Sequence, residues 1–131
     1  MVKEVRKSES SSYLKQAEEF LEVAKKGFER DFYNAAGFNA IQAIINANDA
    51  VCIHFLGQRA SMDHREAVKL HTDLIRILND PSQKRRLSGA LEQRSEVGYL
   101  GKPISKNNAE KLLKDAIIFI EWTKNLLKSF Y

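Results

Sequence analysis

One arginine, Arg94, falls on the side of a predicted helix that should face the protein interior. Between residues 82 and 97, the apolar residues Leu87, Ala90 and Leu91 recur at helical spacing, and Arg94 continues the same stripe. A guanidinium keeps its charge in proteins, so at an inward position it needs a carboxylate, several carbonyl oxygens or an anionic ligand. The sequence therefore predicts either a buried ion pair or a cleft that binds an anion.

The expected counterpart of Arg94 lies on the most apolar stretch of the chain, residues 33–56. This stretch contains no Lys, Arg or Pro, and at about 1.5 Å per residue it would form a helix of roughly 36 Å through the middle of the domain. Asn46 and Asp49 lie on its one polar line, where side chains need partners or a cleft. We expect Arg94 to lie opposite them, either in a functional cleft or in an Arg94–Asp49 pair that only fixes helix register.

Other residue types that carry chemistry offer weaker candidates. His64 and His71 stand about two helical turns apart, roughly 10 Å, which is too far for both to hold one metal ion. We interpret His71 as a hydrogen-bonded core histidine and the lone Cys52 as a buried apolar side chain. No His-Glu-x-x-His, paired cysteine or glycine-rich phosphate motif occurs in the sequence, so it predicts no metal site and no cofactor.

The charge of the chain permits an anionic partner without demanding one. The formal net charge is +4, a mild bias compared with proteins that coat DNA. The basic run Lys84-Arg85-Arg86 is interpreted as a solvated helix face, with phosphate binding as the alternative.

The elements that position these residues are predicted to be helices throughout. Helical periodicity follows the serine cluster at residues 10–12, and Asp63 and Ser105 are expected to cap the third and last helices. Asp31 is expected to cap the central helix, which forms an antiparallel hairpin with the first because their link is short. No segment of period two and no hairpin turn is found, and residues 57–62 are predicted to be a loop.

The 131 residues are therefore predicted to form one domain, residues 1–131, an all-α antiparallel bundle of four to five helices with a flexible N-terminal tail at residues 1–10. The apolar surface of the second and last helices exceeds what one such bundle can bury, so we expect a homodimer. No apolar run approaches the roughly 18 residues of a membrane span, and the N-terminus lacks the apolar core of a signal peptide. We expect a cytoplasmic protein without a membrane partner.

The order of the segments carries a family resemblance over residues 12–127. A helix rich in small residues (AAGFNAIQAIINANDAV) is followed by a glycine-containing loop, a histidine-bearing helix (KLHTDLIRIL), RSEVGY and a capped last helix (SKNNAEKLLKDAIIFIE). This order resembles the HEPN superfamily. The resemblance implies an all-α bundle that usually dimerises. It also implies one of three roles: a metal-independent ribonuclease, the toxin of a toxin–antitoxin pair, commonly beside a minimal nucleotidyltransferase, or a non-catalytic domain that binds nucleotides or RNA.

The ribonucleases of that superfamily carry an arginine followed, after four to six residues, by a histidine. Matched to this motif, Arg94 is the arginine, Ser95 replaces the usual asparagine and Tyr99 stands where the histidine is expected. Cleavage by 2′-OH attack needs a group with a pKa near neutrality, and tyrosine, at about 10, is a poor general base. A literal match from Arg59 to His64 lies outside the motif's place and is interpreted as chance, with a site assembled at a dimer interface as the reserve hypothesis.

The sequence thus predicts a cleft lined by Arg94, Ser95, Tyr99, Asn46 and Asp49. The leading hypothesis is a non-catalytic or catalytically weakened module that binds RNA or a nucleotide and pairs with a nucleotidyltransferase. One alternative is an active ribonuclease toxin, and a second is a structural scaffold.

Overall fold

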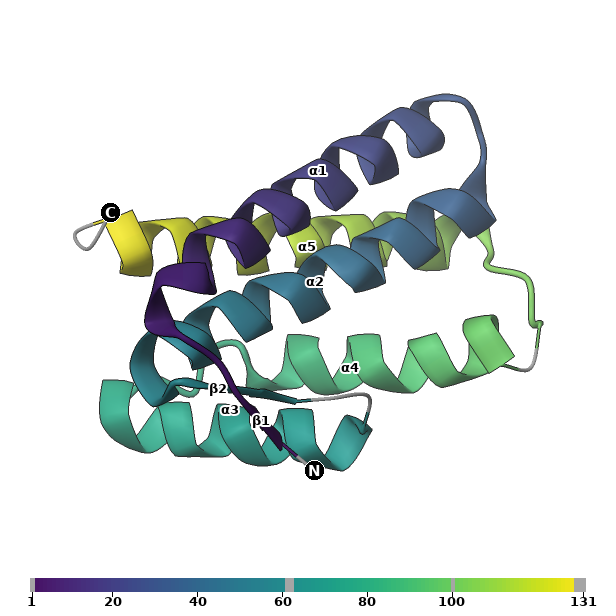
Figure 1. The fold of residues 1–131 in the computed structure, drawn as a ribbon. Helices are drawn as coiled ribbons and strands as arrows, with labels where there is room; N and C mark the ends of the chain where they lie inside the picture. The colour runs from purple at the N-terminus through teal and green to yellow at the C-terminus, as the bar shows by residue number, and fades with distance from the viewer. Residues whose placement is uncertain (1, 61–62, 100, 129–131) are drawn as a thin grey trace.

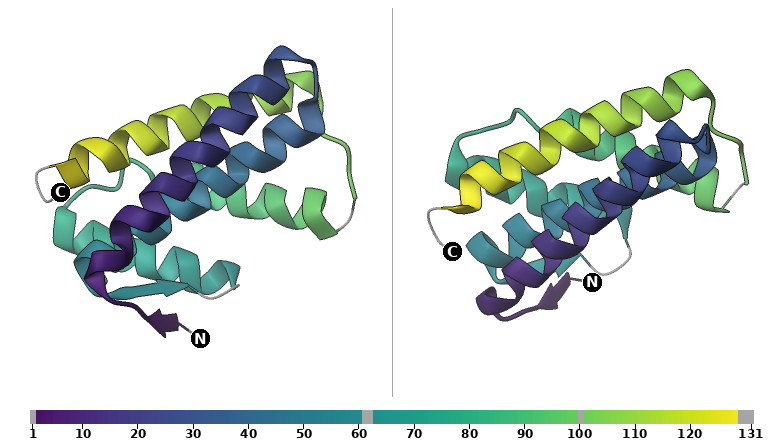
Figure 2. Two further views of the ribbon diagram at one scale, coloured as in Figure 1. Left: turned by 45° about the horizontal axis from the view of Figure 1, so that its top comes forward. Right: turned by 90° about the horizontal axis from the view of Figure 1, so that it is seen from above.

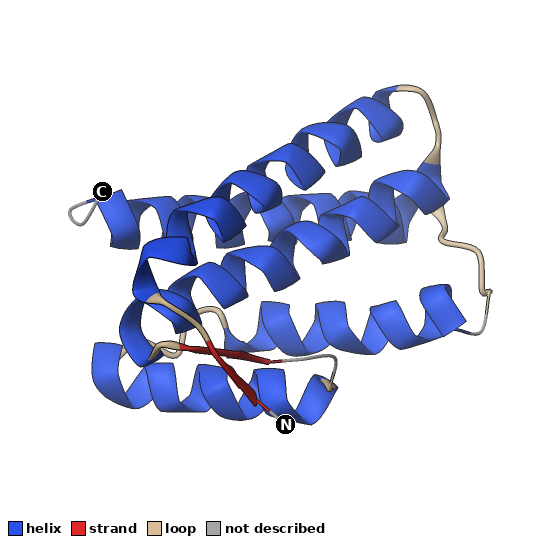
Figure 3. Ribbon diagram, viewed as in Figure 1, coloured by secondary structure: helices blue, strands red, loops and turns tan. Residues whose placement is uncertain are grey.

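The computed structural model describes residues 2–60, 63–99 and 101–128, with the backbone alone for residues 3, 98 and 99. The described part is a bundle of α-helices with a small two-stranded sheet at one end, which confirms the predicted all-α bundle (Figures 1 and 3). Its helices are α1 (Ser10–Glu29), α2 (Tyr33–Leu56), α3 (His64–Leu78), α4 (Lys84–Arg94) and α5 (Lys106–Leu127), and its strands are β1 (Val2–Glu4) and β2 (Gln58–Ala60).

Helix α2 is the centre of the bundle, and its bounds are those that the sequence predicted. All four other helices pack on it, and the two views in Figure 2 show α1 and α5 running along its length. Small residues, above all alanine, let these helices approach closely, while Ile41 and Ile44 of α2 and Phe119 of α5 are among the largest fully buried side chains. The helix ends at Gly57, whose φ of 67° is the left-handed conformation that glycine adopts without strain.

The α1–α2 hairpin forms as predicted, but its link differs in detail. The backbone N–H of Phe32 donates to the carbonyl of Gly27 at 2.8 Å, and Asp31 takes the left-handed conformation with φ of 61°. Phe32 is therefore the N-cap of α2, and the Asp31 carboxylate accepts instead from the Tyr33 hydroxyl at 2.8 Å. The prediction that Asp31 caps α2 was wrong because the chain reverses at that residue.

The N-terminal residues form regular structure where the sequence predicted a flexible tail. Strand β1 pairs antiparallel with β2, with Val2 opposite Ala60, and a 3₁₀ turn at Lys7–Glu9 leads into α1. The hydroxyl of Ser10, the first residue of α1, donates to the carbonyl of Ala50 at 2.7 Å and ties α1 to α2. Strand β2 lies within the segment that was predicted to be a loop. The sequence did not predict this strand, because three residues are too few to show the period of a strand.

Helices α3 and α4 form the second layer, below α2 in Figure 1. Asp63 caps α3 as predicted, since its carboxylate accepts from the N–H of Arg65 at 2.7 Å. Helix α4 is shorter than the predicted range of 82–97, because the chain leaves the α-helix after Arg94 and continues as a π-helical turn, Ser95–Tyr99. Such turns change the direction of the side chains that follow them and are frequent at functional sites.

Helix α5 returns along α1 and α2 and completes the bundle. Ser105 caps it as predicted by accepting from the N–H of Asn108 at 3.1 Å. Among the described residues, none of the helices is both long enough and apolar enough to cross a membrane.

Candidate functional site

A small cavity separates α2 from the second layer. Its volume is about 30 Å³, which is room for a water molecule and not for a nucleobase. It is lined by three residues of α2, three of α4, one each of β2 and α3, and the cap residue of α3: Ile45, Asn48, Asp49, Leu87, Leu91, Arg94, Ala60, Ala67 and Asp63.

Asp49 contributes a carboxyl group that is almost fully buried beside this cavity. Its exposed fraction is 8%, and burial raises its pKa from 3.8 to about 7, while the charges of Arg59 and Arg94 act in the opposite direction. Removal from water penalises the charged form, and two nearby guanidinium groups only partly offset that penalty. Near pH 7, Asp49 is therefore a mixture of acid and carboxylate, the property of groups that transfer protons.

Arg94 lies at the C-terminal end of α4, half-buried, on the wall of the same cavity. Its charge lowers the pKa of Asp49, which shows that the two groups interact electrostatically. The structure therefore brings Arg94 and Asp49 together, as the hydrophobic periodicity of the fourth helix predicted.

Two other predicted site residues, Asn46 and Ser95, do not join them. Asn46 is half-buried and absent from the cavity wall, and its amide donates to the carbonyl of Gln42 in its own helix at 2.8 Å. Ser95 is exposed at the end of α4, where the π-helical turn begins. The side chain of Tyr99 lies outside the described part of the structure, so its place in the cleft stays a prediction.

Asn48, which the sequence did not single out, supplies the amide that the cavity contains. Its Oδ1 lies 2.8 Å from Nδ1 of His71, and both side chains are 1% exposed. Burial and the charge of Lys84 lower the pKa of His71 to about 4 against a raising effect of Asp80, so the imidazole is neutral near pH 7. Nδ1 then donates to Asn48, and the buried Nε2 has no hydrogen-bond partner among the described residues. His71 agrees with its interpretation as a core histidine, and Asn48 joins it to the cavity.

The segment of the literal Arg-x4-His pattern borders the same cavity. Ala60 and Asp63 line it, Arg59 acts electrostatically on Asp49, and His64 follows as the first residue of α3. The guanidinium of Arg59 also lies 5.6 Å from the ring centroid of Tyr13. From the sequence, this pattern and the Arg94 motif were interpreted as separate places, because the sequence does not show that β2 and α4 line one cavity.

No group of three potential metal ligands comes together anywhere in the described ranges. The side chains of the cavity supply a fixed positive charge at Arg94, a proton donor or acceptor at Asp49 and a neutral amide at Asn48.

The protein is thus an all-α domain in which an arginine at the end of the fourth helix interacts with an aspartate of the central helix. The model of the HEPN domain family matches residues 10–126. The chain is also 33% identical over 116 residues to a UPF0332 protein of Archaeoglobus fulgidus, an alignment that covers 86% of this chain and 90% of that relative. The chain therefore belongs to the HEPN family.

Proposed function

We propose that this HEPN domain is a non-catalytic or catalytically weakened module that binds RNA or a nucleotide, with Arg94 contacting a phosphate group. The observation that carries the proposal is the shared cavity of Arg94 and Asp49. Asp49, with a pKa of about 7, carries only a partial negative charge near neutral pH beside the permanently charged Arg94. A phosphate adds negative charge to this region and fits the guanidinium fork.

The size of the cavity limits how a ligand can bind. A volume of about 30 Å³ excludes a base or a ribose, so a ligand has to lie across the rim and not inside. Arg94 lines the cavity and is half-buried, so part of its side chain is accessible to solvent. This geometry favours contact with the phosphate backbone, which gives affinity without base specificity.

The weakened or absent catalysis follows from the sequence at the motif. Tyr99 replaces the histidine that transfers protons in the ribonucleases of the superfamily, and its ordinary pKa of about 10 makes it a poor base at pH 7.

A metal-independent ribonuclease, as in a toxin–antitoxin pair, is the second candidate, and two observations favour it. The raised pKa of Asp49 gives the cavity a group suited to proton transfer, and the segment with Arg59 and His64 borders the same cavity. In this scheme Asp49 or His64 would replace the missing imidazole.

One experiment separates the candidates. Fluorescently labelled unstructured RNA is mixed with the protein in excess chelator, and both anisotropy and chain length are followed. We expect binding without cleavage, and Arg94→Ala should weaken binding by about tenfold, because one charge-assisted phosphate contact is lost. Arg76→Ala is the matched control, since Arg76 is an exposed arginine of α3 away from the cavity lining.

Each other outcome has a defined meaning. Cleavage that is lost in Asp49→Asn or His64→Ala supports the ribonuclease. Equal binding by Arg94→Ala and Arg76→Ala contradicts the phosphate contact. Absence of any binding, together with a sharply lower melting temperature for Arg94→Ala, supports the scaffold hypothesis, in which the Arg94–Asp49 pair only fixes helix register.

We also propose that the protein is a homodimer with a nucleotidyltransferase as its partner protein. Large apolar side chains remain exposed on the described part of the monomer, as the dimer hypothesis requires: Val23, Phe32, Phe38, Ile117 and Ile118. Light scattering should give twice the mass of the 15.0 kDa chain, and a monomer mass at all concentrations would contradict the dimer. Co-purification with the nucleotidyltransferase encoded nearest to it tests the partner.

A further inference from the structure

The α1–α2 hairpin carries a groove between its two helices, here called the hairpin groove. It consists of two hollows of about 430 Å³ and 490 Å³ that share Val23 in their walls. The first hollow is lined by Gln16, Glu19, Phe20, Val23 and Asn39, and the second by Val23, Lys26, Gly27, Glu29, Arg30, Phe32 and Ala35. At about 100° per residue, Glu18 lies roughly 160° around α1 from Phe20. Because Glu18 pairs with Lys124 of α5 at 3.7 Å, the groove faces away from α5.

Apolar side chains of the hairpin groove are exposed to solvent in the monomer. Val23, at its middle, is 50% exposed, and Phe32, at its outer end, is 57% exposed. The amide nitrogen of Asn39 in the first hollow donates to the carbonyl of Ala35 at 2.8 Å, so it already has an acceptor within α2. Covering the groove would therefore remove apolar area from water without depriving this amide of its hydrogen bond, as at a protein contact surface.

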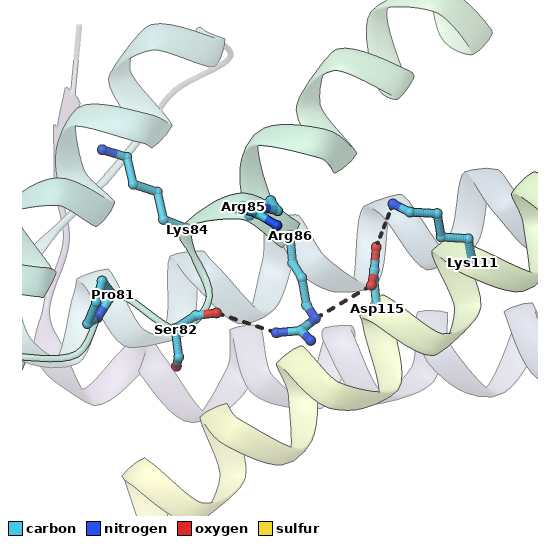
Figure 4. Close-up of a pocket in the computed structure, with 7 residues that line it drawn as sticks. All are labelled: Pro81, Ser82, Lys84, Arg85, Arg86, Lys111 and Asp115. Atoms are coloured by element: carbon cyan, nitrogen blue, oxygen red, sulfur yellow. Dashed lines mark hydrogen bonds and ion pairs between the residues drawn. The ribbon is translucent and has the colours of Figure 1, made fainter.

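The pocket between the first turn of α4 and α5 is of a different kind (Figure 4). Nε of Arg86 lies 3.5 Å from Oδ1 of Asp115, and Nζ of Lys111 lies 3.4 Å from its Oδ2. Lys84 and Arg85 add two further cations to its wall. Charged residues are depleted at the cores of protein interfaces. The hairpin groove is therefore better suited to a protein partner than this pocket.

The two hollows of the hairpin groove carry opposite charges. Glu19 lies in the first hollow, whereas the second contains Lys26 and Arg30 and has a net positive charge. If two copies of α1 pack antiparallel about a two-fold axis at Val23, positions equally far before and after Val23 meet. Glu19, four residues before Val23, then lies near Lys26 of the second copy, three residues after it, and Gln16 lies near Arg30. The groove is therefore complementary in charge to a second copy of itself.

The same arrangement gives the exposed ring of Phe32 a place in the second copy. The backbone N–H of Phe32 donates to the carbonyl of Gly27 at 2.8 Å, so Phe32 lies level with a residue four positions after Val23. The residue four positions before Val23 in the second copy is Glu19, which lines the first hollow together with Phe20. Each Phe32 therefore faces the first hollow of the other copy.

We infer that the hairpin groove binds the hairpin groove of a second copy of this chain, antiparallel, with Phe32 of each copy in the first hollow of the other. The inference rests on the homodimer of the proposed function and deepens it by naming the face and the register. The hairpin groove shares no lining residue with the cavity of Arg94 and Asp49, so this contact occupies neither cavity. One dimer would present two RNA-binding cavities, and an RNA long enough to reach both would bind more tightly than one that fills a single cavity.

Sedimentation velocity over a series of protein concentrations tests the role of Phe32. Phe32→Ser should weaken dimerisation at least about tenfold, because the two-fold axis removes the contact twice. The variant should remain folded, since Phe32 is the N-cap of α2 and serine is a preferred N-cap residue. Ile77→Ser is the matched control, because Ile77 is 56% exposed on α3 and does not line the groove. Thermal melts confirm that each variant is folded.

A mixing experiment at about 50 mM salt tests the pairing of Glu19 with Lys26. Glu19→Lys alone brings two cations together at both ends of the interface, and Lys26→Glu alone brings two anions together, so each variant should dimerise at least about threefold more weakly. An equimolar mixture of the two should associate as tightly as the wild type, because both contacts then join opposite charges. Glu22→Lys mixed with Lys25→Glu is the control, since both residues are exposed on α1 outside the groove.

The outcomes separate this inference from the homodimer itself. A dimer that Phe32→Ser and Ile77→Ser leave equally stable would overturn the inference and place the interface on another face. A mixture of Glu19→Lys and Lys26→Glu that associates no better than either variant alone would refute the antiparallel pairing. A wild-type mass of 15.0 kDa at every concentration would contradict both the hairpin interface and the homodimer.

Discussion

Replacing Asp49 by asparagine should stabilise the protein at high pH and leave its stability nearly unchanged at low pH. Asparagine has the shape of a protonated aspartic acid and no charge, so Asp49→Asn removes only the ionisation of the carboxyl group. In the wild type, the folded state holds this proton more tightly than the unfolded state, since burial raises the pKa from 3.8 to about 7. Between those values the folded protein is protonated and the unfolded chain is not, so the free energy of unfolding falls as pH rises.

The size of the effect follows from the two pKa values. Moving a carboxyl pKa from 3.8 to about 7 corresponds to about 4 kcal/mol, at about 1.4 kcal/mol per pH unit. Asp49 is 8% exposed, so solvent screening reduces this figure little. The free energy of unfolding of Asp49→Asn should therefore exceed that of the wild type by less than about 1 kcal/mol near pH 4 and by about 4 kcal/mol near pH 8.

Urea unfolding of the two proteins at several pH values measures this difference. The stability of the wild type alone would not isolate Asp49, because His71 also makes the free energy of unfolding depend on pH. The folded-state pKa of His71 is lowered to about 4, so its contribution to stability is present above its unfolded pKa of 6.5 and is lost toward pH 4. That contribution is common to both proteins and cancels. A difference that does not vary with pH would refute the description of Asp49 as a buried group with a pKa near 7.

Further substitutions test the packing around the site. Gly37→Ala should destabilise the protein by about 1–3 kcal/mol, because an added Cβ would lie 2.5 Å from Cδ1 of Ile104, whereas Gly89→Ala has open space and should stabilise α4 by about 0.5–1 kcal/mol. Chemical denaturation measures the stability of both variants, and similar effects of the two substitutions would contradict the tight packing around Gly37. Asn48→Ala removes the hydrogen-bond partner of buried His71 and should cost about 1–3 kcal/mol by the same assay, with a stability equal to the wild type as the contrary result.

The elements that follow from local chemistry were predictable from the sequence. The composition of residues 33–56 alone indicated a buried central helix, and Asp63 and Ser105 cap helices because their side chains reach N–H groups two or three residues ahead. Asp31 has the same chemistry and fails as a cap, because its backbone is left-handed at a chain reversal. A residue type can indicate a cap, but the backbone path decides it.

Only part of the candidate site, the pair Arg94 and Asp49, could be predicted from the sequence. Periodicity placed Arg94 inside and opposite α2, and the structure brings it to the cavity with Asp49. Asn46 instead satisfies its amide on its own helix, and Asn48 faces inward because α3 offers His71 as a partner. Which amide of a central helix finds a partner depends on the helices packed against it, and this information is not present in the helix itself.

The proposed contact between RNA and Arg94 has one direct readout, the pKa of Asp49 measured with and without bound RNA. Arg94 lowers that pKa in the free protein. A phosphate on its guanidinium would weaken this attraction and add negative charge nearby, and both changes favour the protonated carboxyl. An NMR titration of the Asp49 carboxyl carbon should therefore show a higher pKa when unstructured RNA is bound. An unchanged pKa at saturating RNA would show that the phosphates bind elsewhere and that Arg94 does not contact them.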